Sequence, residues 1–431
     1  MLTTLWTAAA FLGQTPTAAP IRSDTLTLVR AIELGRARGI GATLARIGER
    51  IAGNRVGQRR SELLPNVSGG ASYTRQTLNL DEFGIPIATG VTDPFSVFHL
   101  TLRASQTIFD PAAFRRVSAA RDSVIAAGLD ASTAGVLAGV AAGLAYLRAQ
   151  SAWETVRARE ADSVVAVRLL EQARQLKEAG VSTGIDLTRS EVNTAVVRSQ
   201  LALARNDRDR TRLDLNRALD FPGDTTLILA TTIDGTVAAI PTDPAEAVKF
   251  ALDHRTEVRA ERQRLAVAEK TRAAIRAENL PSVAASGAYT QGGRETGNLK
   301  GTYVAQIGVA IPIFDGRRRH LRADEEGLRI EGQEARLHDL EGQVDVEARR
   351  ALLDFASATE QVALAQERER LALLELAQAE ERFRAGVAGT IETTNAQTGL
   401  IAARDAVIQA LVSRGVARVS VYKALGILEQ M

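Results

Sequence analysis

The fold is decided by residues 280–314, which read LPSVAASGAYTQGGRETGNLKGTYVAQIGVAIPIF. Between Tyr303 and Ile313 every odd-numbered position is apolar. Alternation with a period of two is typical of a strand whose two faces differ. A loop rich in glycine and polar residues precedes this run, and a smaller alternating run precedes the loop. The segment therefore predicts a β-hairpin.

The same order of signals occurs earlier in the chain. Residues 64–67 read LPNV, residues 98–105 read FHLTLRAS, and each hairpin closes on the triplet Ile-Phe-Asp, at residues 108–110 and 313–315. In the earlier run we expect the apolar side chains on the outer face and the polar ones on the inner face: Phe98, Leu100, Leu102 and Ala104 outside, and His99, Thr101, Arg103 and Ser105 inside. Two hairpins predict four strands in one chain.

The predicted strands are long enough to cross a membrane. Each has about ten residues, the length of a tilted transmembrane β-strand. Alternation alone favours an ordinary soluble hairpin, because the signal of a membrane barrel is weak in each strand. The repetition and the surrounding helices favour the membrane alternative. In that alternative the lipid-facing residues are Leu100, Leu102, Ile307, Val309 and Ile311.

The composition favours long helices and gives no sign of an enzyme. The 431 residues include only 4% aromatics and 11 prolines, and the net charge of +2 gives no reason to expect a nucleic-acid partner. There is no cysteine, which excludes disulfides, thiolate metal sites and a cysteine nucleophile. The four histidines are scattered, and neither Gly-Lys-Ser/Thr nor His-Glu-x-x-His occurs. We therefore expect no catalytic residue, no metal and no cofactor.

The N-terminus resembles an export signal. Residues 1–19 have an apolar core and end in small residues, although no Lys or Arg precedes the core. Elsewhere no run of about 18 residues is uninterruptedly apolar, so we expect no transmembrane helix. The nearest stretch, residues 124–147, is interrupted by Asp130 and is rich in Ala and Gly, which favours close helix packing.

Helical patterns fill most of the remaining chain and occur in two similar halves. Gly180 and Gly386 each end a long helical pattern, and they lie 206 positions apart, as do Asp186 and Glu392. Equal offsets indicate an internal duplication. We expect a first repeat over 20–223, a connector over 224–244 and a second repeat over 245–431. The hairpins are expected at about 66–109 and 281–314, and the turns at about 179–186 and 385–392. The helices are expected over 24–61, 111–178, 185–219, 245–278, 317–384 and 391–425.

These lengths predict a rod that needs other copies of itself. Helices of roughly 68 residues are about 100 Å long, and two half-length helices can stack end to end beside each of them. The hairpins then lie at one end of the rod and the glycine turns at the other. Open strand edges are not tolerated in lipid, and bacterial barrels begin at about eight strands. A chain with four strands must therefore associate, and two, three or four copies would each close a barrel.

In these features the chain resembles the TolC-like outer-membrane efflux proteins. The resemblance is carried by Leu-Pro-x-Val before each hairpin, Ile-Phe-Asp after it, the two helix–glycine–helix turns, and residues 381–387 (ERFRAGV) and 421–426 (VYKALG). It implies a mainly helical fold with a small membrane β part. The implied assembly is a homotrimer whose strands form a twelve-stranded β-barrel in outer-membrane lipid, continued by a twelve-helix α-barrel in the periplasm.

The resemblance also implies a function. The chain would be the passive exit duct of a tripartite efflux or type I secretion system, moving small molecules or proteins together with a periplasmic adaptor protein and an inner-membrane pump. No cofactor and no nucleic acid is implied. The alternative is a soluble periplasmic coiled-coil scaffold without channel activity.

By resemblance, the two glycine turns form the periplasmic tip, where family members carry acidic residues that constrict the pore. Here Asp186 and Glu392 follow the turns, and Asn395 stands one helical turn later, where a second acid is common in the family. Stabilisation by a helix dipole, worth about 0.3–1 kcal/mol, is an equally good reason for both acids. The resemblance implies adaptor docking at Gly180, Val181, Gly386 and Val387, although a simple helix cap explains the glycines too. Family members carry a tyrosine and a basic residue that help to hold the tip closed. By resemblance, the corresponding positions in this chain are Phe383 and Ala388.

Overall fold

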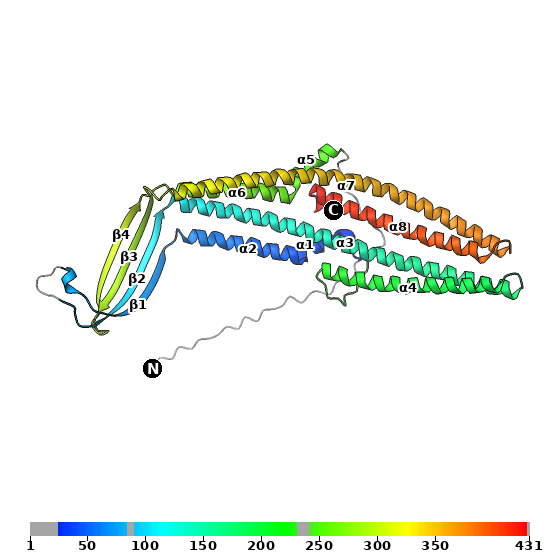
Figure 1. The fold of residues 1–431 in the computed structure, drawn as a ribbon, viewed down its shortest axis with the longest axis horizontal. Helices are drawn as coiled ribbons and strands as arrows, with labels where there is room; N and C mark the ends of the chain where they lie inside the picture. Colours follow the sequence, from blue (N-terminus) through cyan, green and yellow to red (C-terminus); the bar gives the residue numbers. More distant parts are fainter. Residues whose placement is uncertain (1–24, 84–89, 231–240, 242, 429–431) are drawn as a thin grey trace.

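The structure, a computed structural model, describes residues 25–83, 90–230, 241 and 243–428. They form a rod with a four-stranded sheet at one end and two helical turns at the other (Figure 1). The helices are α1 (Leu28–Arg38), α2 (Ile40–Ser61), α3 (Pro111–Glu178), α4 (Gly184–Ala218), α5 (Pro244–His254), α6 (Thr256–Ala277), α7 (Arg318–Arg384) and α8 (Thr390–Leu425). The strands are β1 (Asn66–Gln76), β2 (Phe95–Phe109), β3 (Ser282–Gly293) and β4 (Lys300–Ala310), and the short 3-10 helix η1 (Leu80–Phe83) follows β1. The predicted export signal and part of the predicted connector lie outside the described residues.

The four strands pair in chain order and all antiparallel, so β1 and β4 are the free edges of the sheet. Directly paired residues point to the same face. Leu102 pairs with Tyr289, which pairs with Tyr303 in β4. Every second residue of a strand returns to the same face. One face therefore carries four of the predicted lipid-facing residues: Leu100, Leu102, Ile307 and Val309.

A β-bulge near the end of β2 changes which residues face outward. The register shifts between Thr107 and Phe109, and Phe109 pairs with Val283, whose own partner is Val309. The bulge therefore brings Phe109 to the apolar face, although strict alternation from Leu102 would place it on the other one.

The last strand is shorter than predicted. β4 ends at Ala310, whereas the alternation of apolar residues continues to Ile313. Pro312 has no N–H group to donate to a neighbouring strand, which explains the early end. Ile311 therefore lies one residue beyond β4, with an exposed side chain, rather than within a lipid-facing strand.

The long helix of the first repeat has the predicted bounds. Asp110 caps α3 by accepting hydrogen bonds from the N–H groups of Ala112 and Ala113, at 2.9 and 3.1 Å, and Pro111 occupies the first turn. In the second repeat Gly316 and Arg317 both have left-handed backbones, and α7 begins at Arg318. α3 thus begins directly after its Ile-Phe-Asp triplet, whereas Gly316 and Arg317 separate the second triplet from α7.

Two segments that were predicted as single helices are each broken in two. Gly39 separates α1 from α2, and a Cβ added there would lie 2.5 Å from the carbonyl oxygen of Gly35. Arg255 separates α5 from α6 with an extended backbone, ψ 125°. Its guanidinium is buried and pairs with Glu257 and Glu347. The second break therefore depends on a residue of α7, which no local pattern could show.

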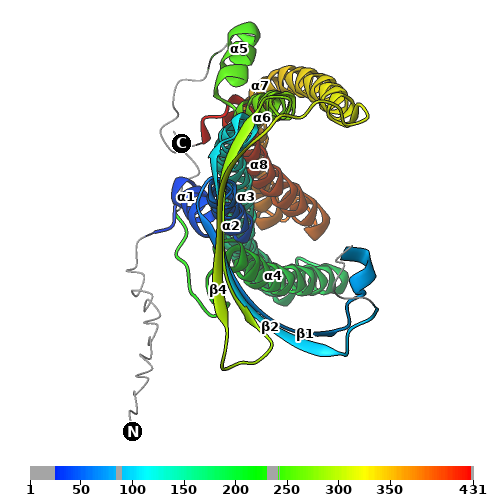
Figure 2. The ribbon, with the colours of Figure 1, turned by 90° about the vertical axis from the view of Figure 1, so that its left-hand side faces the viewer.

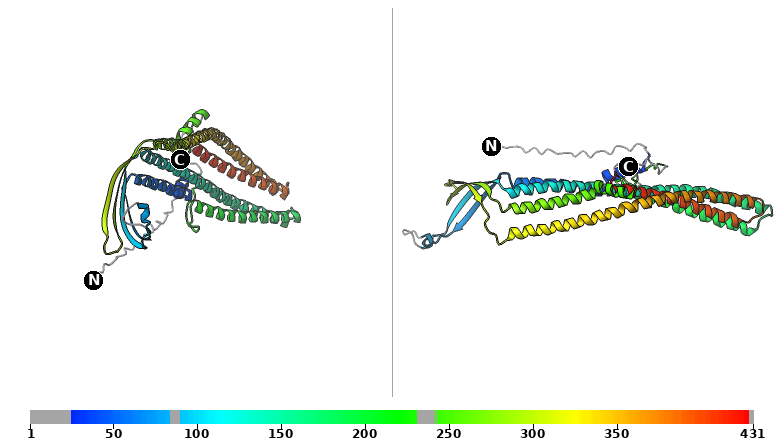
Figure 3. Two further views of the ribbon diagram at one scale, coloured as in Figure 1. Left: turned by 60° about the vertical axis from the view of Figure 1, so that its left-hand side comes forward. Right: turned by 90° about the horizontal axis from the view of Figure 1, so that it is seen from above.

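The helices form a curved wall one layer thick (Figures 2 and 3). Beside the sheet the order across the wall is α2, α3, α6 and α7, and towards the turns it is α4, α3, α8 and α7. The two long helices, α3 and α7, run the whole length, and the shorter helices stack end to end beside them. The main apolar core lies at mid-height, where α1 and α5 cover the wall and bury residues such as Tyr146, Leu219 and Tyr422.

In the described part of the chain one helix, α3, contains a window that is long and apolar enough to cross a membrane by length and composition. The Ala- and Gly-rich part of α3 packs closely against α1. A Cβ added to Gly35 of α1 would lie 2.4 Å from the Cβ of Ala142, and one added to Gly143 would lie 3.0 Å from Ile32. Small residues thus let the two helices approach, as the sequence predicted for this stretch.

Candidate functional site

The two turns at the far end of the rod have the same backbone geometry. Gly180 and Gly386 have φ values of +75° and +72°, in the left-handed region that favours glycine. The N–H groups of Val181 and Val387 each donate back to the helix, to Leu176 at 2.9 Å and to Arg382 at 3.1 Å. This is the usual glycine stop of a helix, repeated once in each half of the chain.

The two turns also lie against each other. A Cβ added to Gly386 would lie 3.3 Å from a methyl carbon of Val181. The side chains of Val181 and Val387 are exposed. The structure therefore brings together the four residues for which the sequence predicted adaptor docking: Gly180, Val181, Gly386 and Val387.

Asp186 bridges the two repeats at the tip. Its carboxylate accepts hydrogen bonds from the hydroxyls of Thr183 and Ser182 in its own turn, and from the hydroxyl of Thr390 at 2.7 Å. Thr390 is buried at the start of α8. The Thr183 hydrogen bond, followed by that from Thr390, lowers the pKa of Asp186 to about 2. The carboxylate is therefore a fixed negative charge that joins α4 to α8.

Glu392 has a basic partner in its own chain. Its carboxylate lies 2.8 Å from Arg382 Nε, across the turn between α7 and α8, and both side chains are partly exposed. Asn395 follows one helical turn later and is exposed as well. Phe383 is buried. Of the three residues predicted for the constriction, Glu392 and Asn395 are thus exposed, and Asp186 lies in the contact between repeats.

One motif at the tip was missed by sequence analysis. Residues 180–184 read Gly-Val-Ser-Thr-Gly, which matches the Gly-x-Ser-x-Gly pattern of a serine hydrolase elbow. That elbow joins a strand to a helix, whereas this segment joins α3 to α4. The Ser182 hydroxyl donates a 3.3 Å hydrogen bond to Asp186 and so stabilises the turn. Within the described residues, no group of three or more His, Asp or Glu is placed to hold a metal ion.

A buried ion network further from the tip was also missed. Asp162 of α3 is only 1% exposed, and its carboxylate lies 2.9 Å from Arg159 and 2.5 Å from Arg404 of α8. Arg159 also pairs with Asp405 of α8, and Gln397 donates to the backbone oxygen of Asp162. The sequence signal is only an ordinary Arg–Asp pair three residues apart, because the other partners lie over 200 residues away.

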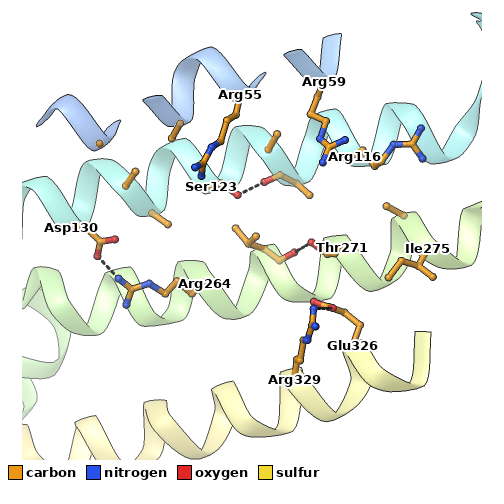
Figure 4. Close-up of a pocket in the computed structure, with 18 of the residues that line it drawn as sticks. Arg55, Arg59, Arg116, Ser123, Asp130, Arg264, Thr271, Ile275, Glu326 and Arg329 are labelled. Carbon is orange, nitrogen blue, oxygen red and sulfur yellow. Dashed lines mark hydrogen bonds and ion pairs between the residues drawn. The ribbon is translucent and has the colours of Figure 1, made fainter. Parts of the chain in front are cut away.

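A half-open cavity of about 920 Å³ lies between α2, α3, α6 and α7, near the sheet (Figure 4). Small residues of α3, including Ala119, Ala126 and Ala127, form part of its lining. Its rim is charged, but most of the charges are paired, for example Arg264 with Asp130 at 2.5 Å and Arg329 with Glu326 at 3.1 Å. This balance gives the cavity no clear preference for one class of ligand.

The sheet has one apolar and one polar face. On the polar face Thr101 and Thr290 share a hydrogen bond at 3.3 Å, and Gln306 donates to Ser286 at 3.1 Å. The side chains of the predicted lipid-facing residues are exposed, Ile307 to 73%. An exposed apolar band of this kind marks an interaction with lipid or protein.

These features define the class of protein: an elongated component of a channel, with a membrane-type sheet at one end and a long helical body behind it. The chain matches the outer membrane efflux protein family over residues 43–220 and again over residues 247–427. It belongs to this family. It is an outer-membrane exit duct for efflux, and its helices extend into the periplasm.

Solved channel structures have the same fold. The outer membrane channel CmeC of Campylobacter jejuni is 18% identical, with a TM-score of 0.77 over 93% of this chain and 85% of CmeC. CusC is 18% identical, with a TM-score of 0.79 over 93% of this chain and 92% of its own. The open state of the MtrE channel of Neisseria gonorrhoeae is 19% identical, with a TM-score of 0.72 over 99% of this chain and 98% of MtrE. No curated protein sequence matches the chain.

Proposed function

We propose that the chain works as a homotrimer, in which three sheets close into one twelve-stranded barrel and three helical walls close into one tube. The observation that carries this proposal is the sheet with two free edges, β1 and β4. In lipid the unpaired N–H and C=O groups of an edge strand would each cost several kcal/mol, so β4 of one copy must pair with β1 of the next.

The width of the barrel favours three copies over two. Two copies would give about eight strands, and the interior of such a barrel is just wide enough for its own side chains. Three copies are the smallest number that leaves more room, as a duct for small molecules or proteins requires. The polar face of the sheet, with Thr101, Arg103 and Gln306, would then line the passage.

The edges of the helical wall support the same assembly. Large apolar side chains are exposed on α2 and α4 at one edge and on α7 at the other. Contact between α7 of one copy and α2 and α4 of the next would cover them. The residues concerned include Ile40, Leu44, Ile47 and Ile51 of α2, Val192, Val196 and Leu203 of α4, and Leu321, Leu328 and Leu353 of α7.

We propose that the tip of this trimer is the gated entrance. Asp186, Glu392 and Asn395 would surround the narrowest point, where three copies of Glu392 form a ring that favours cations. The exposed Val181 and Val387, with Gly180 and Gly386 beside them, offer a docking surface for a periplasmic adaptor protein that leads to an inner-membrane pump. The channel is passive and catalyses no reaction.

The test is the number of chains per assembly, measured by cross-linking in membranes and by sizing in mild detergent. A cysteine at Ser72 of β1 and another at Thr302 of β4 cannot meet within one sheet, because these strands are its opposite edges. The chain has no other cysteine, so a short bifunctional thiol reagent should give a ladder that ends at three chains. A soluble monomer or dimer would contradict the proposal and favour the scaffold alternative. A ladder that ends at two or four chains would contradict the trimer alone.

A further inference from the structure

We infer that the junction between the sheet and the helices is a binding belt for anionic phospholipid headgroups of the inner leaflet of the outer membrane. The belt consists of residues 59–64, 109–116, 276–282 and 314–322, where α2, α3, α6 and α7 meet the four strands at one level (Figure 1). The inference rests on the outer-membrane location and not on the number of copies proposed above.

Each of the four junctions has an exposed apolar side chain on the side of the sheet. Leu64 is 59% exposed, Phe109 50%, Leu280 46% and Phe314 81%. Apolar and aromatic side chains at this level are typical of the boundary between hydrocarbon and headgroups. The four junctions thus mark one membrane surface.

Each junction also has arginine on the side of the helices. The belt contains nine arginines against four acidic residues, which leaves a net charge of +5 in a chain whose total is +2. Arg60 and Arg276 lie four residues before Leu64 and Leu280, which follow the ends of α2 and α6. Before α7, Arg317 and Arg318 lie three and four residues after Phe314.

The four acids of the belt are already occupied by a different set of arginines. Glu62 pairs with Arg59 and Arg116, and Asp110 with Arg116. In the second repeat Asp315 pairs with the buried Arg319, and Glu278 with Arg322. Within the described residues none of these acids forms a salt bridge with the other arginines of the belt, and Arg318 acts on Asp315 only through its charge.

Five exposed arginines of the belt remain. One of them, Arg115, donates a hydrogen bond to the backbone oxygen of Ala273 at 3.0 Å. The other four are Arg60, Arg276, Arg317 and Arg318. Within the described residues none of their guanidinium groups has a hydrogen bond or a salt bridge. Two of them begin α7, where a positive charge opposes the helix dipole. Arg317 also has a left-handed backbone, with φ +67°, which is unfavourable for a residue with a side chain. An external phosphate would offset both costs, because arginine binds phosphate through paired hydrogen bonds.

The experiment uses the full chain reconstituted in phosphatidylcholine bilayers. Spin-labelled phosphatidylglycerol and spin-labelled phosphatidylcholine are added in turn, and the fraction of each lipid immobilised at the protein is measured by electron paramagnetic resonance. We expect the protein to prefer phosphatidylglycerol by roughly fivefold, and less at about 1 M salt, where screening acts within about 3 Å. The variant with R60Q, R276Q, R317Q and R318Q should lose this preference.

A matched control removes four exposed arginines from the helices far from the sheet: R198Q, R210Q, R350Q and R368Q. This variant should keep the preference. The four belt arginines replaced by lysine should keep most of it, which separates charge from misfolding. Equal immobilisation of the two lipids by the wild-type protein, or an equal loss in the control variant, would overturn the inference. All variants should retain the oligomer size of the wild type, so that failure of the belt is distinguishable from failure of the trimer.

Discussion

The hydroxyl of Thr390 donates a 2.7 Å hydrogen bond to the carboxylate of Asp186, and so joins the first turn of α8 to the first turn of α4 across 204 residues. If the tip opens by separating these helices, Thr390→Val removes one bond that holds it closed. A hydrogen bond to a charged group is worth about 1.5–3 kcal/mol, so the open fraction should rise by roughly tenfold or more in single-channel recordings. Thr398→Val is the control, because that hydroxyl bonds only within α8, to Thr394 at 2.9 Å. Equal effects of both variants would show that this contact does not hold the tip.

The same carboxylate predicts that the tip resists acid. The pKa of Asp186 is lowered from 3.8 to about 2, first by the Thr183 hydroxyl and next by Thr390. A lowered pKa means that the stabilisation is fully present above the ordinary value and is lost as the pH falls through about 2. Conductance should therefore stay constant from pH 7 to about pH 4 and rise only in stronger acid. In Thr390→Val this rise should occur at a higher pH. An opening between pH 5 and 6 would indicate a different titrating group.

Charge at the entrance should depend on Glu392. Because three copies would form the ring, Glu392→Gln is expected to reduce the preference for cations over anions, measured as the reversal potential across a planar bilayer in a salt gradient. Its partner Arg382 stays unpaired in this variant, which adds to the effect. Glu381→Gln removes the same charge from an exposed residue near the end of α7 and serves as the control. Unchanged ion selectivity in Glu392→Gln would mean that Glu392 is not part of the constriction.

A positive charge on the apolar face of β4 should impair assembly far more than the same charge on its polar face. Ile307→Arg places a cation on the apolar face, which costs about 2–4 kcal/mol near the middle of a bilayer. Gln306→Arg places it on the polar face, next to Ser286. Heat-resistant oligomers in outer-membrane fractions should decrease strongly for Ile307→Arg and little for Gln306→Arg. Normal assembly of Ile307→Arg would mean that the lipid-facing side of the sheet is assigned wrongly.

The buried network should matter more for stability than any exposed ion pair. Asp162→Asn leaves Arg159 and Arg404 without their shared partner, and breaking a buried pair in this way costs about 3–5 kcal/mol. Denaturant unfolding should show this loss. Glu367→Gln breaks the exposed pair with Arg370 in α7 and should cause no measurable change. Equal stability of the two variants would show that other contacts offset the loss of the buried ion pairs.

Local signals in the sequence predicted the strands, the long helices and the turns. Alternation identified the apolar face with Leu102 and Ile307, Asp110 and Pro111 marked the start of α3, and Gly180 and Gly386 marked the two tip turns. Each of these depends on residues close together in the chain. The break at Arg255 and the bulge at Phe109 depend on partners in other elements, Glu347 and Val283, and were not predictable in this way.

In the candidate site, too, the features that depend on neighbouring residues were predictable and those that depend on distant partners were not. The acids at the start of α4 and α8 and the valines after the glycines are visible as a repeated pattern. The pairing of Asp186 with Thr390, of Glu392 with Arg382 and of Asp162 with Arg404 is not visible, because threonine and arginine are common at helix surfaces. The number of copies is not decided by the sequence alone, since four strands fit several closed barrels.

A wall only one helix thick has consequences for how the protein is made. Most of its helices are not covered by a second layer, so a newly exported chain must cross the periplasm with the apolar side chains at the edges of its wall exposed. If the protein assembles as proposed, we expect such a chain to depend on holdase chaperones until it meets other copies, and its half-life before assembly to depend on how many copies are present. Expression level, rather than sequence alone, then decides how much of the protein matures and how much is degraded.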